Sequence, residues 1–324
     1  MKRYAHALIT LAVVAIAAPV LATRANAQTV VTLGSVGSSS ANGWPSYVAI
    51  EKGLYAAVGI KPDTVFAQSN AAVIQQVAAG SINVSTNSGL VDPIRANEKG
   101  APVAILRVEI QRPPYALLAK SAIKTPADIK GKLISVGGAK DITRIYVERM
   151  LEQRGVKPGE YDLAYAGATS ARFAALSSLA VDAAILTPPF NFNAQSAGFV
   201  NLGNINEYVD MLFAGIAVNT KWAEANKETV GKIIGVYNRS IAWLYQPENR
   251  AEAVVILNKV SKLKTEDVEQ AYDYLIGGRF FEPTGKVSKT LIGKLNDALK
   301  TLGDLPKDFP VDRLFLAGAT QVAE

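Results

Sequence analysis

Short apolar runs alternate with segments of helical period along the first third of the chain. Each run is four to eight residues long, and glycine, serine or asparagine lies at or just after the end of most runs, which is typical of buried strands. The strands that this pattern predicts are 29–34, 60–67, 82–86 and 103–108. The helices predicted between them are 44–58, 70–79 and 90–99. Strands that alternate with helices indicate an α/β fold with mostly parallel sheets and helices on both faces.

A second alternating series follows Pro113 and Pro114, which cannot donate backbone hydrogen bonds and therefore mark an edge or a crossing segment. It predicts strands at 132–136, 162–166 and 183–187, and helices at 142–154 and 170–179. A strand at 211–220 then returns the chain. Beyond it, helical period dominates, and the helices predicted there are 227–245, 248–259, 265–276 and 287–302.

This order predicts two lobes joined by two crossings. Lobe one would comprise 28–112 and 213–324, and lobe two would comprise 113–212. Two crossings form a natural hinge, which we expect near 112–116 and 211–216. In open α/β sheets, ligands bind outside the carboxyl ends of the strands. Two such sheet edges would therefore face one another across a cleft.

The first 27 residues have the character of a secretory signal peptide. Lys2 and Arg3 precede an apolar run at 7–22, and the Ala-Asn-Ala site at 25–27 favours cleavage after Ala27. A membrane anchor is the alternative, but the run is short for a span and contains Pro19. We therefore expect a soluble, periplasmic mature chain that begins at Gln28.

Charge and composition exclude several classes of function. The leader holds three of the chain's 34 basic residues and none of its 28 acids, so the mature chain carries a net charge of only +3. Without a basic run, binding to nucleic acid is not expected. The chain has no cysteine, and its single histidine, His6, lies in the leader. Disulfides, thiolate nucleophiles, Ser-His-Asp triads and histidine-based zinc sites are thereby excluded.

Polar residues gather where each predicted strand meets the following helix. Exposed backbone N–H groups at such helix starts favour an anion or a polar oxygen, although plain helix capping explains any one loop equally well. The candidate ligand-binding residues from lobe one are Ser38, Ser39, Asn42, Trp44, Ser69, Asn70, Asn87 and Ser88. Those from lobe two are Lys140, Asp141, Thr143, Arg144, Thr169, Thr187 and Phe190.

These candidates differ in chemistry. Trp44 and Phe190 could hold an apolar ligand body between two rings, or they could pack beneath helices. Lys140 and Arg144 could pair a carboxylate or sulfonate, whereas Asp141 could meet an amine or cap a helix. Arg172 is a further cation candidate. No catalytic residue, metal site or cofactor is expected.

The pattern A-x-E-x-G-x-x-x-x-x-G occurs as Ala49, Glu51, Gly53 and Gly59 within "WPSYVAIEKGLYAAVGIKPDTVFAQSNAAVIQQVAAGSINVS". Two further patterns are "IKGKLI" at 129–134 and "LSSLAVDAAILTPPF" at 176–190. With these patterns, the stretch from about 40 to 220 resembles the nitrate/sulfonate/taurine-type substrate-binding proteins of bacterial ABC importers. The sequence departs from the family at Asn83, where an aspartate is usual, and in the "GGAKDIT" loop.

The resemblance implies a two-lobe periplasmic-binding-protein fold of type II that closes around a small solute. It also implies a membrane permease with its ATPase as partners, and we expect a monomer. More cations than acids lie near the loops of lobe two, so we expect a small carboxylate or sulfonate as ligand. Three alternatives stay open: a ligand that is a pyrimidine precursor of thiamine, a periplasmic sensor, and an exported enzyme that works without histidine.

Overall fold

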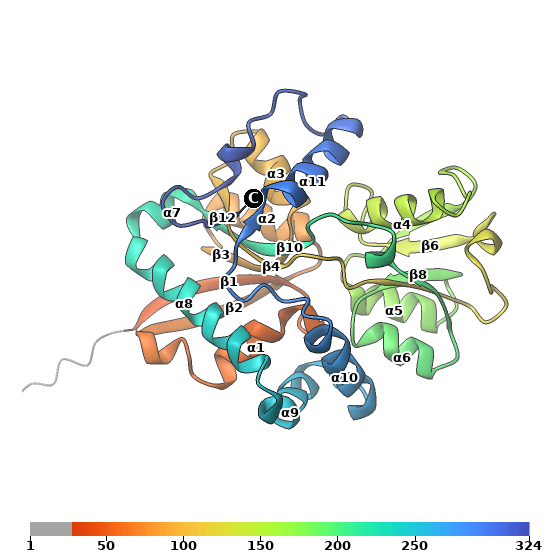
Figure 1. Cartoon of the computed structure of the whole chain (residues 1–324), viewed down its shortest axis with the longest axis horizontal. Coiled ribbons are helices and arrows are strands. Elements are labelled where there is room, and N and C mark those ends of the chain that lie inside the picture. The colour runs from red at the N-terminus through yellow and green to blue at the C-terminus, as the bar shows by residue number, and fades with distance from the viewer. Residues whose placement is uncertain (1–27, 324) are drawn as a thin grey trace, which may run out of the picture.

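The computed structural model describes residues 28–323, which form two lobes, each built on a five-stranded sheet (Figure 1). The predicted leader lies outside the described residues. In order of pairing, the strands of lobe one are β2 (Ile60–Ala67), β1 (Thr29–Val36), β3 (Val84–Gly89), β10 (Ala214–Asn219) and β4 (Val103–Ile110). Those of lobe two are β7 (Asp162–Tyr165), β6 (Leu133–Val136), β8 (Ala183–Leu186), β5 (Ala116–Ala119) and β9 (Val200–Asn204).

Eleven α-helices surround the sheets in the described part of the chain. They are α1 (Trp44–Glu51), α2 (Asn70–Ala79), α3 (Val91–Glu98), α4 (Ile142–Glu152), α5 (Thr169–Ser177), α6 (Phe190–Ser196), α7 (Thr220–Ala225), α8 (Lys227–Leu244), α9 (Arg250–Ser261), α10 (Thr265–Tyr272) and α11 (Lys289–Thr301). A short strand pair, β11 (Val287–Ser288) and β12 (Val322–Ala323), lies apart from the two large sheets.

The two sheets are mixed, as predicted, but each has as many antiparallel as parallel pairings. In lobe one, β1 runs parallel to β2 and β3, whereas β10 is antiparallel to β3 and β4. In lobe two, β6 is parallel to β7 and β8, whereas β5 is antiparallel to β8 and β9. The strands β5 and β10 are the first after each crossing and run against their neighbours, whereas the other four strands of each sheet share one direction, so the prediction of mixed, mostly parallel sheets is confirmed.

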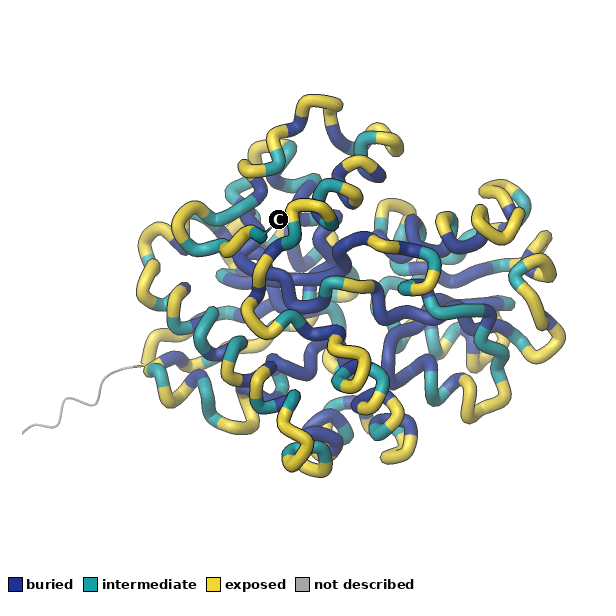
Figure 2. The backbone as a smooth tube through the Cα atoms, viewed as in Figure 1, coloured by how far each residue is buried: buried dark blue, intermediate teal, exposed yellow. Residues whose placement is uncertain are grey.

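Side chains that alternate along the strands feed two apolar layers in each lobe. In lobe one, Val31 and Leu33 pack in one cluster with α1 and α8, while α2 covers the other face. In lobe two, Leu117 and Ile185 belong to the cluster that includes α4, and Leu118 and its neighbours pack with α5 and α6. The strands β4, β5, β8 and β10 are accordingly buried along their whole length, whereas the edge strands β2 and β7 are partly exposed (Figure 2).

The outer edge of β4 is covered by the end of the chain. Phe281 and Phe315 form isolated bridges to Ile110 and Ile105, and Val108 N–H donates to the carbonyl of Gly285. An uncovered edge would offer unpaired backbone groups to other chains. The C-terminal segment therefore completes lobe one, and it explains why every residue of β4 is buried.

Several elements differ from their predicted bounds. The helix predicted at 44–58 ends at Glu51, because Gly53 adopts a left-handed φ of 64° and the chain continues as a turn and a short 3-10 helix. Residues 287–288, predicted as helix, pair as β11 before α11 begins. The strand β9 and the helix α6 were not predicted, because their sequences VNLGN and FNFNAQS carry polar residues at positions that a clear period would make apolar.

The chain passes between the lobes twice, from β4 to β5 and from β9 to β10. The boundaries predicted at 112/113 and 212/213 lie in these two segments, and as domain boundaries they remain a prediction. Pro113 and Pro114 lie in the first segment, which fits their predicted place in a crossing. Helix α10 of the C-terminal part also reaches lobe two, where Asp267 accepts hydrogen bonds from Asn193 and Ser196 of α6.

Replacing Trp44 with Phe should lower the free energy of unfolding by about 1–3 kcal/mol, because the buried hydrogen bond to the Ala253 carbonyl would be lost and the smaller ring would leave a void. The Trp44 ring is fully buried, its Nε1–H donates to that carbonyl at 3.0 Å, and it meets Tyr272 edge to face. Urea unfolding followed by circular dichroism measures the change. Trp222→Phe is the control, since Trp222 is only partly buried and its indole has no such bond; equal losses in both variants would contradict the assignment.

Candidate functional site

A cavity of about 60 Å³ lies between the lobes, at the carboxyl ends of β1, β3 and β8. Seven of the predicted ligand-binding residues line it, namely Asn42, Ser69, Asn70, Asn87, Asp141, Thr169 and Thr187. Residues from both lobes meet directly at its wall. The Ser40 and Thr187 hydroxyls are 3.1 Å apart, and Ala41 N–H donates to the carbonyl of Pro188 at 2.9 Å. The two lobes are thus in contact around an enclosed polar space.

The wall from lobe one presents amide groups. Asn42, Asn70 and Asn87 line the cavity, and the Oδ1 atom of each is buried with no hydrogen-bond partner among the described residues. Asn70 is held in place by its Nδ2, which donates to the Gly89 carbonyl at 2.9 Å and to Asp92 Oδ2 at 2.6 Å. Buried polar atoms without partners are rare in folded proteins. These three therefore favour a ligand that can donate hydrogen bonds.

Asn87 and Asn70 are each backed by a buried carboxyl group. Asn87 adopts a left-handed φ of 56°, and its N–H donates to Glu109 Oε2 at 2.8 Å. Burial raises the pKa of Glu109 to about 7, although nearby Arg107 and the Asn87 N–H oppose the shift. Burial likewise raises the pKa of Asp92 to about 6, against the hydrogen bond from Asn70. Two acids with raised pKa values thus hold the polar wall of lobe one.

The wall from lobe two consists of two helix starts. Asp141 caps α4, because its Oδ1 accepts from Thr143 N–H at 2.9 Å, and Thr143 Oγ1 accepts in turn from Gly137 N–H at 2.8 Å. At α5, Thr169 Oγ1 accepts from Thr187 N–H at 3.2 Å. Thr143 is buried behind this wall and does not line the cavity. Asp141 thus caps the helix, which was one of the two roles considered for it, and it also lines the cavity.

Arg172 on α5 brings a positive charge to the cavity. It is 3% exposed, its Nε donates to the Ile185 carbonyl at 2.7 Å, and its Nη1 donates to the Gly167 carbonyl. Its guanidinium carbon lies 5.9 Å from the centre of the Tyr115 ring. No carboxylate within residues 28–323 forms an ion pair with it. A buried cation held only by neutral groups is costly, so the site favours an anion.

The other predicted residues lie outside the cavity. The expectation that two rings flank the ligand differs from the structure: Trp44 is in the core, and Phe190 packs against Phe173 with ring centres 5.5 Å apart. Burial of both rings among apolar side chains stabilises the fold, and a position in an exposed cleft would lose that stabilisation. Ser88 is fully buried, Ser38 lines a second cavity, and Ser39 lines neither.

Lys140 and Arg144, expected near an anion, instead lie on the outer rim between the lobes. Lys140 Nζ is 3.8 Å from Asp304 of lobe one, which also pairs with Arg95, and Arg95 donates to the Lys140 carbonyl. Arg144 pairs with Glu148 at 2.7 Å on its own helix. Their long side chains extend to neighbouring carboxylates and do not extend into the cavity. Lys140 therefore links the two lobes, and Arg144 lies on the surface of lobe two. Arg172 is the one predicted cation candidate that lines the cavity.

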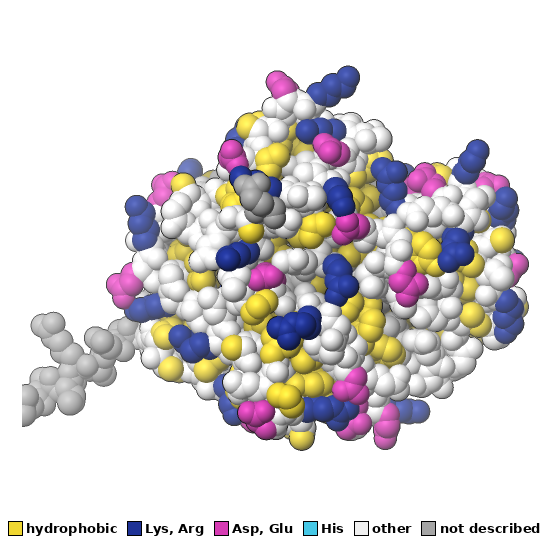
Figure 3. Space-filling view, viewed as in Figure 1, with side chains coloured by type: hydrophobic (Ala, Val, Ile, Leu, Met, Phe, Trp, Pro, Cys, Tyr) yellow, Lys and Arg dark blue, Asp and Glu magenta, His cyan; other side chains and the backbone are white. Residues whose placement is uncertain are grey.

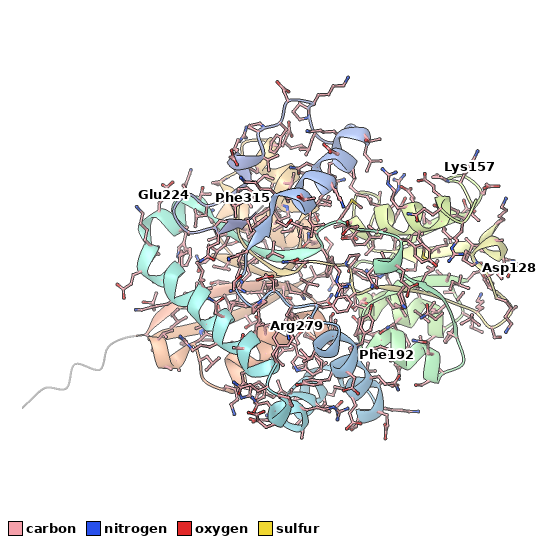
Figure 4. The ribbon with its side chains drawn as sticks, viewed as in Figure 1. Asp128, Lys157, Phe192, Glu224, Arg279 and Phe315 are labelled. Atoms are coloured by element: carbon pink, nitrogen blue, oxygen red, sulfur yellow. The ribbon has the colours of Figure 1, made fainter. Side chains whose placement is uncertain are left out.

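Contacts on the opposite rim involve α6 and the C-terminal part. Phe192 of α6 meets Tyr274 edge to face, with ring centres 5.9 Å apart, and Figure 4 labels Phe192 near Arg279 at this junction. The labelled Asp128 and Lys157 mark the far end of lobe two, and Glu224 and Phe315 lie on lobe one. Charges of both signs are interspersed on the visible face, with no extended patch of one sign (Figure 3).

Sequence reasoning missed several lining residues, among them Ser40 and Phe213. Ser40 lies in the same serine run as Ser38 and Ser39, and only its position in the turn separates them. Tyr115 follows the two prolines of the first crossing, where a ligand can reach it, and it lines the cavity. Phe213 lies on the second crossing, and its apolar surroundings in the sequence gave no signal.

Within 28–323, no three metal-binding side chains of His, Cys, Asp or Glu cluster. No helix among these residues combines the length and the apolar character needed to cross a bilayer.

Comparison with known proteins places the chain. The family described as "NMT1/THI5 like" matches residues 40–251, and no curated protein matches the chain. Among solved structures, the alkanesulfonate-binding protein SsuA of Xanthomonas axonopodis pv. citri bound to MOPS is similar, with 21% identity, a TM-score of 0.72 and coverage of 91% of this chain and 99% of that one.

Two further structures share the fold. The periplasmic aliphatic sulphonate binding protein SsuA of Escherichia coli has 19% identity and a TM-score of 0.69, covering 90% of this chain and 98% of that chain. The periplasmic nitrate-binding protein NrtA of Synechocystis PCC 6803 has 15% identity and a TM-score of 0.71, covering 89% and 84%. The predicted two-lobe periplasmic-binding-protein fold is confirmed.

The Glu109→Gln variant should lose less stability than the parent as pH rises. The pKa of Glu109 in the folded chain, about 7, lies above the ordinary value of 4.5, so folding favours the protonated acid. The stability that this preference provides is present below the ordinary value and is lost as pH rises through about 7. Melting temperatures between pH 5 and pH 8 measure the difference. The exposed change Glu224→Gln should keep the parent's pH dependence; identical profiles for Glu109→Gln and parent would contradict the assignment.

Proposed function

The chain belongs to the NMT1/THI5-like family, and from that premise we propose that it is the periplasmic solute-binding component of an ABC importer. In this role it captures a small organic anion between its lobes and presents the closed form to a membrane permease with its ATPase. It acts as a monomer and carries out no catalysis. The likeness to sulfonate-binding and nitrate-binding proteins supports this role.

The observation that carries the proposal is Arg172. Its guanidinium lies at the cavity with neutral partners only, and a buried charge of this kind is satisfied by an opposite charge. A planar guanidinium also matches carboxylate and sulfonate oxygens. The helix starts of α4 and α5 add partial positive charge on the same side. The anionic head is therefore held by lobe two.

Asp141 and the three asparagines, Asn42, Asn70 and Asn87, surround the anionic head of the proposed solute. Asp141 uses Oδ1 for its cap, and its carboxylate limits how close a second anionic group can approach. The asparagine Oδ1 atoms of lobe one accept hydrogen bonds. The solute that fits has one anionic end and at least one N–H or O–H group facing lobe one.

Each of the three alternative functions requires different features of the chain. A thiamine pyrimidine precursor is cationic or neutral and would leave Arg172 without a counter-charge. An exported enzyme would have to work without histidine or cysteine, because residues 28–324 contain neither. A sensor would bind the same solute but need a membrane receptor in place of a permease. Thermal-shift screening of carboxylates, sulfonates and pyrimidines distinguishes the ligand classes, since binding to the folded state raises the melting temperature.

Replacing Arg172 with Met should weaken anion binding roughly tenfold to over a hundredfold, the effect of losing a charge-assisted hydrogen bond worth about 1.5–3 kcal/mol. Calorimetric titration with the best anion from the screen measures it. Arg144→Met and Lys140→Met are matched controls that remove a cation from the rim, and they should bind far more nearly as the parent does. Parent-like binding by Arg172→Met, or a cation as best ligand, would refute the anion assignment.

Replacing Gly167 with Ala should impair closure. Gly167 of lobe two has a φ of 66°, and an added Cβ would lie 2.3 Å from the Gln68 carbonyl oxygen of lobe one. The lobes must separate to relieve that clash, so affinity should fall and the radius of gyration with saturating ligand should exceed that of the parent in small-angle scattering.

Gly155→Ala provides the control for that experiment. Gly155 has a similar φ of 77°, but nothing lies within 4 Å of its added Cβ. It therefore carries the backbone strain of the substitution without the contact between lobes. If Gly167→Ala binds and closes as Gly155→Ala does, the proposed closure contact is wrong.

A further inference from the structure

A second cavity, of about 150 Å³, lies within lobe one. Its lining residues fall in 33–86 and 256–260, so lobe two contributes none of them. Side chains of 38–43 and 86–87 line one cavity or the other, and the backbone of these residues lies between the two cavities. The lobe-one cavity is therefore a space of its own, which a molecule can occupy whether or not the lobes are closed.

A short side chain on one face of the sheet leaves this cavity open. Leu33 and Ser35 of β1 lie on the same face, because side chains alternate along a strand, and their register partners Thr64 and Phe66 on β2 share it. Helices α1 and α9 cover that face and contribute apolar side chains such as Ile256. The Ser35 side chain is too short to fill the space beneath the helices, so an apolar space remains there.

Two hydroxyl groups in the lobe-one cavity have no partner. Ser35 is 6% exposed and Tyr47 is partly buried, and neither side chain forms a hydrogen bond with another residue in the described range. In contrast, Ser46 Oγ, which also lines the cavity, is 2.6 Å from the Tyr237 hydroxyl. Buried polar groups normally have partners. The Ser35 and Tyr47 hydroxyls are therefore free to bind a ligand.

The position of the Tyr47 ring depends on a glycine. A Cβ at residue 43 would lie 2.8 Å from the Tyr47 hydroxyl oxygen, so only Gly43 leaves room for the ring where it is. Burial raises the pKa of Tyr47, so the hydroxyl keeps its proton and can both donate and accept a hydrogen bond. An apolar space with a few placed polar groups is typical of small-molecule sites.

The charges around the lobe-one cavity are already paired. Glu51 is the one charged residue that lines it within 28–323, and its Oε2 accepts from Lys259 Nζ at 2.6 Å. An ionised ligand would therefore lose its hydration without gaining a counter-charge. A dry cavity of roughly 150 Å³ can hold a molecule the size of benzene. The space thus suits an uncharged molecule of about one ring.

The mouth of the lobe-one cavity opens to solvent on lobe one. Ile50 of α1 and Phe66 of β2 line it and are 40% and 49% exposed. Large apolar side chains are usually more buried than this. A molecule can enter between these two side chains without passing through the cavity that contains Arg172.

We propose that the lobe-one cavity is a second binding site, which takes an uncharged, ring-sized molecule whose hydroxyl or carbonyl group pairs with Ser35 and Tyr47. Its ligand differs in charge and in place from the anion proposed between the lobes. The inference goes beyond the proposed function and does not rest on it, because no residue of lobe two takes part.

The test titrates the parent with three probes: phenol, toluene and the benzylammonium ion. Phenol should bind with a Kd on the order of 1 mM, as burial of one aromatic ring predicts. Toluene, which has no hydroxyl, should bind roughly two- to tenfold more weakly, and benzylammonium should not bind. In methyl NMR spectra, phenol should shift the signals of Ile50 and Ile256, which line the cavity, and leave that of Ile185 in lobe two unchanged.

Two conservative variants test the hydroxyl groups. Tyr47→Phe and Ser35→Ala each remove one hydroxyl and keep most of the side chain. Each should weaken the binding of phenol roughly two- to tenfold and leave the affinity for toluene nearly unchanged, since the apolar walls remain. A role in folding alone would change the affinities for both probes together.

Bulky variants test the mouth. Ile50→Trp and Thr64→Trp narrow the cavity from α1 and from β2, at positions exposed enough to leave the core intact. Each should weaken the binding of phenol at least roughly tenfold, because the ring loses most of its buried contact area. Val255→Trp is the matched control, since Val255 is 56% exposed on α9 and does not line the cavity, and it should bind phenol as the parent does.

Arg172→Met separates this site from the one between the lobes. It should bind phenol as the parent does, because Arg172 does not line the lobe-one cavity. The lobe-one site is refuted if phenol shifts neither Ile50 nor Ile256, if Arg172→Met weakens phenol binding, or if Ile50→Trp and Thr64→Trp bind phenol as the parent does. Tighter binding of benzylammonium than of phenol would refute the uncharged class. None of these results bears on the anion titration, which tests the proposed function by itself.

Discussion

A buried guanidinium with no carboxylate partner is the constraint on which the site depends. Arg172 is fixed by the carbonyl of Ile185 in β8 and by that of Gly167 in the loop between β7 and α5. Carbonyl oxygens satisfy its donors but do not neutralise its charge, and the cost of burying an ion is several kcal/mol. An anion from solution can supply the missing charge only while it lies between the lobes. The same residue therefore links ligand charge to the position of lobe two.

The contacts between the lobes fall into two kinds that respond differently to solvent. Near the cavity they are neutral and short, such as Ser40 to Thr187 and the Ala41 N–H to the Pro188 carbonyl. At the rim they are ionic, as between Lys140 and Asp304, where the lysine side chain is 76% exposed. Exposed ion pairs contribute little and are screened by salt. In the closure that we propose, the inner hydrogen bonds and the fit of Gly167 against Gln68 define the closed position, and the rim charges contribute less.

Sequence patterns predicted the lobes and most strands, because apolar runs bounded by glycine and serine have few other outcomes. The polar loops of the site were also predictable, since they follow strands whose carboxyl ends must converge. The predicted positions of side chains were wrong where contacts between residues far apart in the sequence determine them. Trp44 is at the start of a helix beside the serine loop, but α9 and α10, two hundred residues later, enclose it. Lys140 lies in the correct loop, but Asp304 attracts it outward. Neither partner can be assigned from local sequence.

Small residues after β1 acquire a physical role once both cavities are considered together. Gly37, with a left-handed φ of 64°, lets the loop approach Ala168 of lobe two, where an added Cβ would be 3.4 Å away. Gly43 leaves space for the Tyr47 ring on the opposite side. Between them the serines carry hydroxyls without bulk, so the loop can be polar toward the lobe interface and still thin toward the apolar cavity. Small, polar and tightly turned residues from Gly37 to Gly43 therefore allow one loop to face the cavity between the lobes on one side and the cavity within lobe one on the other.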